Sequence, residues 1–156
     1  MSYREPFVPT PVDVIPVMLG LASLKEGELV YDLGSGDGRL AIAAARDYGA
    51  RVVGVEINKT KVSESRRRLR ELGLSSRVKI LNRNFRDVNL KDADVLALYL
   101  SSYILNSLTP KFESELKQGV RLVNFDFEVP AWKAAKVLRV RPKGWRTTHP
   151  VYLYKV

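Results

Sequence analysis

A short apolar strand runs into a glycine-rich turn at Val30-Tyr31-Asp32-Leu33-Gly34-Ser35-Gly36-Asp37-Gly38. The alternate glycines allow the backbone to turn tightly and to approach a ligand closely. Residues 38–48 follow as a small, alanine-rich helix, and residues 52–55 as a second apolar strand. A strand, a tight turn, a helix and another strand predict the first unit of an open α/β sheet. In such sheets ligands bind beside this turn, beyond the carboxyl ends of the strands.

The same alternation of strands and helices continues along most of the chain. We expect further helices over 12–23 and 59–72, and further strands over 77–81, 93–99 and 119–125. A helical stretch follows the strand at 93–99, and Pro110 is expected to open its second segment. Strands that alternate with helices predict a parallel sheet with helices on both faces.

The end of the chain breaks this alternation. Two strand candidates, 136–140 and 151–154, have no helix between them and therefore predict a hairpin. The predicted fold class is α/β: a Rossmann-like, doubly wound, mostly parallel seven-stranded sheet with an antiparallel C-terminal hairpin. Residues 1–156 are expected to form a single domain, in which the proline-rich residues 1–11 are an extended arm.

Composition excludes several classes of site. The 156 residues contain no cysteine and one histidine, so disulfides, thiolate zinc sites, iron–sulfur clusters and cysteine nucleophiles are ruled out, and no metal site is expected. No apolar run approaches the length of a membrane span, and no targeting segment is visible at the start, so we expect a cytoplasmic protein. The net charge of +9 indicates acidic or nucleic-acid partners only if it gathers on one face.

The charges around the glycine turn indicate which ligand it binds. Glu56 ends the second strand, where an acid can accept both hydroxyls of an adenosine ribose. A dinucleotide fingerprint would need glycine or alanine at the position of Arg39. Asp32 and Asp37 flank the turn and would repel a pyrophosphate but attract a cationic amino group and a sulfonium. The sequence therefore favours S-adenosyl-L-methionine over NAD.

With these residues the sequence resembles the class I S-adenosylmethionine-dependent methyltransferases. More narrowly, it is similar to the small archaeal protein lysine methyltransferases. That likeness rests on short motifs in order along the chain: Phe7-Val8-Pro9-Thr10-Pro11, Gly38-Arg39, Glu56-Ile57-Asn58, Asn84-Phe85 and Thr148-His149-Pro150-Val151-Tyr152-Leu153-Tyr154. The resemblance implies an enzyme that transfers a methyl group to lysine side chains of proteins.

The resemblance also implies a set of cofactor-binding positions, some of them named above for their charge. Asp32 and the turn would hold the methionine end, Ile57 would lie against the adenine, and Thr10 would close over the cofactor. The full set is Thr10, Asp32, Gly34, Ser35, Gly36, Asp37, Gly38, Glu56, Ile57, Asn84, Phe85 and Leu100.

The acceptor lysine must lose its proton, and an aromatic-lined channel favours its neutral form. Candidate catalytic residues near such a channel are Tyr99, Tyr103 and Asp126, with Glu128 and His149 as further candidates. The expected partners are protein substrates with exposed lysines. An RNA methyltransferase and a non-catalytic nucleotide-binding module remain as alternatives. Nucleic-acid contact through Arg66-Arg67-Arg68-Leu69-Arg70 is less expected, because a solvated helix face is the default for such a run.

Overall fold

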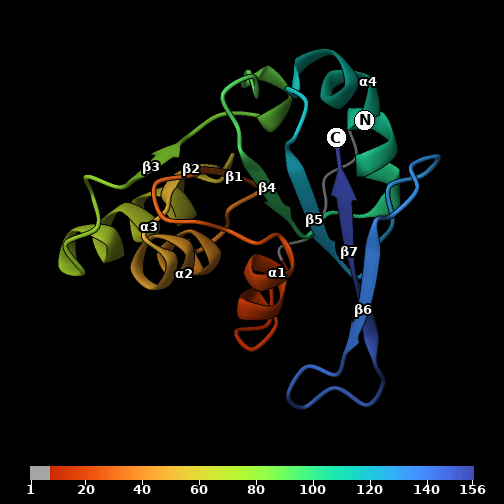
Figure 1. Ribbon diagram of the computed structural model, residues 1–156. Coiled ribbons are helices and arrows are strands. Elements are labelled where there is room, and N and C mark those ends of the chain that lie inside the picture. The colour runs from red at the N-terminus through yellow and green to blue at the C-terminus, as the bar shows by residue number, and fades with distance from the viewer. Residues whose placement is uncertain (1–7) are drawn as a thin grey trace.

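The computed structural model describes residues 8–156 and contains one seven-stranded sheet. Its strand order is β3-β2-β1-β4-β5-β7-β6, and the strands from β1 to β5 run parallel (Figure 1). The order reverses between β1 and β4, which places the switch point next to the glycine turn. The predicted doubly wound, mostly parallel sheet is confirmed. The expected arm at 1–11 lies mostly outside the described residues.

The elements lie close to the predicted ranges. In chain order they are α1 (Ile15–Leu21), β1 (Leu29–Leu33), α2 (Arg39–Tyr48), β2 (Arg51–Val55), α3 (Lys59–Glu71), β3 (Val78–Leu81), the 3-10 helix η1 (Phe85–Asp87), β4 (Val95–Leu98), α4 (Ser102–Glu115), β5 (Arg121–Phe125), β6 (Lys136–Val140) and β7 (His149–Lys155). Among the described residues, no helix combines the length and apolarity that a membrane crossing requires.

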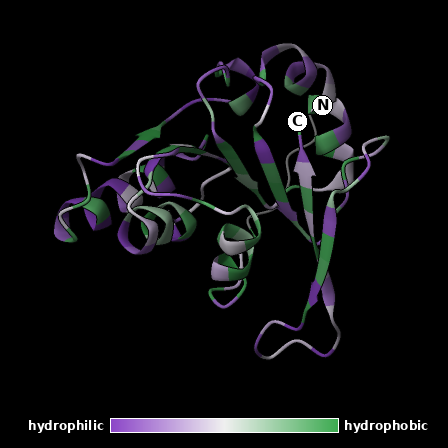
Figure 2. Cartoon of the chain, viewed as in Figure 1, coloured by the Kyte–Doolittle hydropathy of each residue, from purple (hydrophilic) through white to green (hydrophobic). Residues whose placement is uncertain are grey.

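Two apolar cores cover the two faces of the sheet. Val123 of β5 belongs to the core that also includes side chains of α1, α2 and α3, whereas Leu122 belongs to the core that includes side chains of α4. Side chains of a strand point alternately to opposite faces, so a strand that is apolar at every position is buried on both. Figure 2 shows much of the central strands in green, interrupted by purple segments at polar positions. The sheet is therefore a rigid support for the loops at its carboxyl edge.

The C-terminal hairpin is antiparallel, as predicted, and β7 lies between β5 and β6. β7 pairs with β5 from Phe125↔Val151 to Arg121↔Lys155. β6 pairs with β7 from Val140↔His149 to Lys136↔Leu153 and forms one edge of the sheet. This register places the start of β7 beside the carboxyl end of β5, where ligands bind in this fold.

One prediction about the helices is wrong. Pro110 does not open a second segment, because α4 continues through it from Ser102 to Glu115. The apolar face of α4, which includes Leu108 and Phe112, is buried on both sides of the proline. The carbonyl of Asn106 loses its helical partner at Pro110, but Asn106 is exposed to solvent. Burial of the continuous apolar face therefore outweighs the loss of one hydrogen bond.

Candidate active site

The turn after β1 holds its shape through backbone hydrogen bonds to the next strand. The amides of Gly34 and Ser35 both donate to the carbonyl of Val55, at 2.8 and 3.0 Å. Gly34, Gly36 and Gly38 all have positive φ, at 80°, 58° and 83°. A side chain at these positions would strain the backbone, which is the physical reason for the alternate glycines. The turn thus presents bare backbone at the carboxyl edge of the sheet.

Glu56 lies directly beside this turn and is 9% exposed. Its Oε1 accepts a hydrogen bond from the amide of Gly36, and its Oε2 accepts one from the amide of Asn58, each at 2.8 Å. Each carboxylate oxygen has a further lone pair. Glu56 therefore fixes the turn and can still accept two hydroxyl groups of a ribose.

Asp32 is a buried carboxyl without a partner. It is 5% exposed, and no hydrogen bond or ion pair reaches it from the rest of residues 8–156. Burial, followed by repulsion from Glu56 and Asp37, raises the pKa of Asp32 to about 7. The hydroxyl of Ser35 is likewise buried with no partner among the described residues. Unpartnered polar groups of this kind indicate a ligand site.

These groups suit S-adenosylmethionine. A cationic amino group would compensate the buried charge of Asp32, and Ser35 could bond to the methionine end. The cavity beside them is only about 30 Å³ and is lined by Val8, Pro9 and Tyr99. Ligand pockets for nucleosides measure roughly 300 Å³ or more. Residues 8–10 of the arm line this cavity and narrow it.

Asp37 and Thr10 both contact Arg39, a residue to which the sequence analysis gave no role beyond the resemblance. Arg39 pairs with the carboxylate of Asp37 at 2.8 Å, and its Nη1 donates to the carbonyl of Thr10 at 3.1 Å. Burial acts to raise the pKa of Asp37, but hydrogen bonds from Arg39 outweigh it and hold the pKa below its usual value. Arg39 thereby joins the arm to the turn.

The residues expected at the adenine lie around the ends of β2 and β3. The side chain of Ile57 is 53% exposed, so it is accessible for an apolar contact with a ligand. Asn84 caps η1 through the amide of Arg86, and Phe85 packs partly into the core that faces α4. Asn82, which follows β3, was not among the predicted residues. Its amide donates to the carbonyls of Glu56 and Ile57 and so positions both residues.

The acceptor corner, as we define it, consists of Tyr99, Phe125, Asp126, Phe127 and His149 at the ends of β4 and β5. Tyr99 packs edge-on to Phe125 and parallel to Phe127, with ring centroids 4.9 and 6.3 Å apart. Asp126 has a φ of 74°, and its Oδ1 lies 2.7 Å from Nδ1 of His149. Tyr99 also lines the cofactor cavity. The corner thus brings aromatic rings and the Asp126–His149 pair together beside Tyr99, which faces the cofactor cavity.

Asn124 holds this corner in place and was also missed. It is fully buried, and its side chain bonds to the amide and carbonyl of Leu100, each at 3.1 Å, and to the carbonyl of Phe127 at 2.8 Å. Leu100 lies beside the turn, because a side chain at Gly34 would meet its Cδ2 at 3.7 Å. Of the other candidates, Tyr103 is 68% exposed on the first turn of α4. A buried asparagine in an otherwise apolar strand was the available signal for Asn124.

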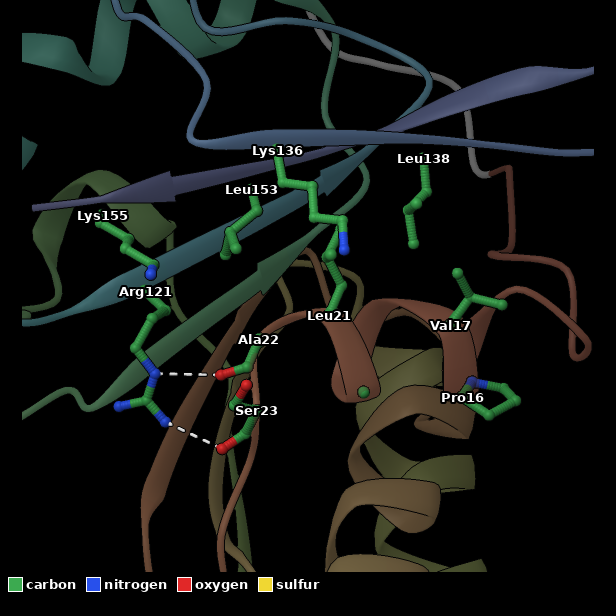
Figure 3. Close-up of a pocket in the computed structure, with 11 residues that line it drawn as sticks. Pro16, Val17, Leu21, Ala22, Ser23, Arg121, Lys136, Leu138, Leu153 and Lys155 are labelled. Carbon is green, nitrogen blue, oxygen red and sulfur yellow. Dashed lines mark hydrogen bonds between the residues drawn. The ribbon is translucent and has the colours of Figure 1, made fainter.

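A larger hollow, of about 610 Å³, lies elsewhere, between α1 and the sheet formed by β5, β7 and β6 (Figure 3). Among the described residues its lining is largely apolar and includes no carboxylate, with Arg121 and Lys155 at the amino end of β5 and Lys136 on β6. We call it the α1 groove. A cofactor with an amino group and a ribose diol would meet cations there and no carboxylate among the described residues, so the site beside Asp32 and Glu56 is the candidate cofactor site.

Comparison with known proteins identifies the family. Residues 32–136 match the family of the ANTKMT methyltransferase domain. The chain is 38% identical to a protein-lysine N-methyltransferase of Saccharolobus islandicus, over 100% of this chain and 98% of the relative. The chain belongs to the ANTKMT methyltransferase family. It is also 30% identical, over 88% of its length, to the adenine nucleotide translocase lysine N-methyltransferase of mouse, of which it spans 60%.

A solved structure has the same fold over nearly the whole chain. An RNA methyltransferase from Salinibacter ruber, in complex with S-adenosyl-L-homocysteine, aligns with a TM-score of 0.88 and 34% identity, covering 95% of this chain and 93% of that one. Other methyltransferases with the same fold were also solved with S-adenosylhomocysteine. The protein is an S-adenosylmethionine-dependent methyltransferase. The predicted cofactor, S-adenosylmethionine, is thereby confirmed. The roles of individual site residues stay predictions.

Proposed function

We propose that this ANTKMT-family methyltransferase modifies lysine side chains of proteins. The support comes from the acceptor corner, where aromatic rings lie beside the cofactor cavity and next to the Asp126–His149 pair. The archaeal relative that matches over full length is named a protein-lysine N-methyltransferase. Aromatic surroundings exclude water and favour the neutral amine over the ammonium form of lysine. A neutral amine is the form that accepts a methyl group.

The residues of the site have distinct roles in this reaction. S-adenosylmethionine, when bound, supplies a methyl group on a sulfonium. Glu56 and Asp32 hold the nucleoside and the amino acid ends, while Tyr99 and Phe127 position the lysine amine. His149, held by Asp126, accepts the proton that the ammonium loses. The neutral amine held by Tyr99 and Phe127 would then be the group that receives the methyl from the cofactor, whose sulfur would be left as a neutral thioether.

The proposal is tested by following the methyl group. The purified protein is incubated with radiolabelled S-adenosylmethionine and with the protein fraction or the RNA fraction of a cell extract. We expect protease-sensitive label, with methyllysine identified by mass spectrometry. Label in RNA alone would contradict the proposal and favour the second candidate, which the similarity to the Salinibacter ruber enzyme keeps open. Calorimetry with S-adenosylmethionine and NAD tests the non-catalytic alternative, which predicts binding without methyl transfer.

Replacement of Asp126 tests the proton acceptor. Asn is chosen because it tolerates positive φ as well as Asp does. We expect Asp126→Asn to lower kcat for a lysine peptide on the order of a hundredfold near neutral pH, the usual size of acid–base assistance. The loss should shrink toward about pH 10, where free lysine itself deprotonates. Initial rates across pH measure this.

A matched control is Asp92→Asn, which removes one carboxylate at an exposed position. It should leave kcat within about twofold. Calorimetry should show that Asp126→Asn still binds S-adenosylmethionine as the unmodified protein does. A loss of rate that is the same at every pH would show that Asp126 shapes the corner without serving proton transfer.

A further inference from the structure

The positive charge of the chain is concentrated at its C-terminal end. Residues 129–156 contain seven lysines and arginines and no aspartate or glutamate, whereas the first 128 residues carry a net charge of only +2. The seven cations are Lys133, Lys136, Arg139, Arg141, Lys143, Arg146 and Lys155. Most of them lie on the hairpin of β6 and β7, which extends from the body of the molecule (Figure 1).

None of these seven side chains is neutralised within residues 8–156. All seven are exposed, and no ion pair includes any of them. Arg139 donates to the hydroxyl and carbonyl of Thr148, which are uncharged groups. Clustered like charges repel one another and attract an anionic partner. The hairpin is therefore a cationic surface available for binding.

The loop of the hairpin, residues 141–148, borders the acceptor corner. Its Trp145 packs edge-on against His149, with ring centroids 4.6 Å apart, and against Phe125 at 5.7 Å. The amide of Lys143 donates to Asp13, which ties the loop to the segment before α1. The cations of this loop therefore lie on a segment that packs directly against the acceptor corner.

The α1 groove continues this surface and indicates a polypeptide partner. Figure 3 shows Val17 and Leu21 of α1 facing Leu138 and Leu153 of the hairpin, with Lys136 above them. A phosphate backbone would leave such an apolar floor uncovered. A polypeptide can cover it with apolar side chains while its carboxylates meet the cations. Charge and apolar surface together fit an acidic protein segment.

We propose that the hairpin selects lysines that are flanked by acidic residues in the protein substrate. This inference rests on the proposed lysine methyltransferase function and names its substrate class. Carboxylates on either side of the target lysine contact Arg141, Lys143 and Arg146, whereas basic flanks are repelled. The same cations disfavour the ammonium form of the arriving lysine, since like charges lower its pKa.

The test uses three peptides that differ only around one central lysine. The flanking residues alternate alanine with glutamate, glutamine or arginine. For the unmodified protein we expect kcat/KM to be at least about tenfold higher with glutamate than with glutamine flanks, lowest with arginine flanks, and to converge as salt shortens the Debye length. In the triple variant Arg141→Glu, Lys143→Glu, Arg146→Glu the order of the three peptides should reverse.

The matched control is Arg70→Glu, Arg77→Glu, Lys79→Glu, which changes the net charge equally with exposed residues at the β3 end of the sheet. It should keep the original order. Melting temperature and S-adenosylmethionine affinity show that both triple variants fold. Equal rates for the three peptides, or an order unchanged in the hairpin variant, would overturn the inference and leave lysine methylation standing.

Two other outcomes distinguish a failure of the proposed function from a failure of this inference alone. If no lysine peptide is methylated at all, the proposed function fails and this inference falls with it. If the peptide order is absent while the hairpin variant alone loses affinity for a fluorescent RNA or DNA oligonucleotide, the surface binds nucleic acid and the inference is wrong. Anisotropy at the salt concentration of the rate assay measures this binding.

Discussion

Glu56→Ala is expected to lower the affinity for S-adenosylmethionine by at least tenfold. A hydrogen bond to an ionised acceptor contributes about 1.5–3 kcal/mol, and the ribose offers two hydroxyl donors. The structure adds a second cost, because the same carboxylate holds the amides of Gly36 and Asn58 at 2.8 Å. Without it the turn loses the contact that fixes Gly36. Isothermal titration of the variant with S-adenosylmethionine measures the loss.

Glu56→Gln separates these two contributions. Glutamine keeps one acceptor oxygen, so one of the two amides stays bonded, while the other meets an NH₂ group that cannot accept. We expect an intermediate affinity for S-adenosylmethionine and a melting temperature closer to that of the unmodified protein than Glu56→Ala shows. An unchanged affinity in Glu56→Ala would show that the ribose is held by other residues, and the assignment of this site would then be wrong.

The sequence predicted the fold well because its signals are local. The central strands are short, mostly apolar runs, and several turns and helix ends carry glycine or a capping residue, such as Asn58 at the start of α3. The antiparallel hairpin followed from the missing helix between two strand candidates. Pro110 was misread because a local rule for helix breaks was outweighed by burial of Leu108 and Phe112 across it. Tertiary packing of this kind cannot be read from one segment.

The residues of the candidate cofactor site are easier to bring together from the sequence than those of the acceptor corner, because their spacing along the chain is local. Asp32 and the glycines are contiguous in sequence, and Glu56 follows at a spacing that the fold determines. The acceptor corner depends on contacts between distant segments: Asp126 meets His149 only because β7 pairs with β5, and Asn124 reaches Leu100 across neighbouring strands. A residue's type gives no indication of such a partner until the sheet order is known.

Asp32→Asn is expected to make the protein more stable and less able to bind its cofactor. Burial raises the pKa of Asp32 to about 7 in the folded state, from 3.8. The folded protein therefore holds a proton on Asp32 that the unfolded chain releases. Compared with lower pH, the free energy of unfolding falls as pH rises from the unfolded pKa of 3.8 to the folded pKa of about 7. At about pH 8 asparagine, which cannot ionise, should raise the free energy of unfolding by up to about 4 kcal/mol, and the difference should vanish near about pH 3, below the pKa of the unfolded carboxyl. Urea denaturation of the two proteins without cofactor, at each of these pH values, measures the difference in the free energy of unfolding.

The affinity for S-adenosylmethionine should change in the opposite direction. An ionised Asp32 attracts a cationic amino group in a buried site, and asparagine does not, so we expect a loss of about a hundredfold, or about 2.7 kcal/mol. In the unmodified protein the affinity should fall as pH drops below about 7, because Asp32 must first release its proton, whereas Asp32→Asn should show no such dependence. Calorimetry in two buffers of different ionisation enthalpy counts the proton released on binding. If the variant is stabilised but binds S-adenosylmethionine as tightly as before, the buried carboxylate does not hold the amino group, and that group must be placed elsewhere along the turn.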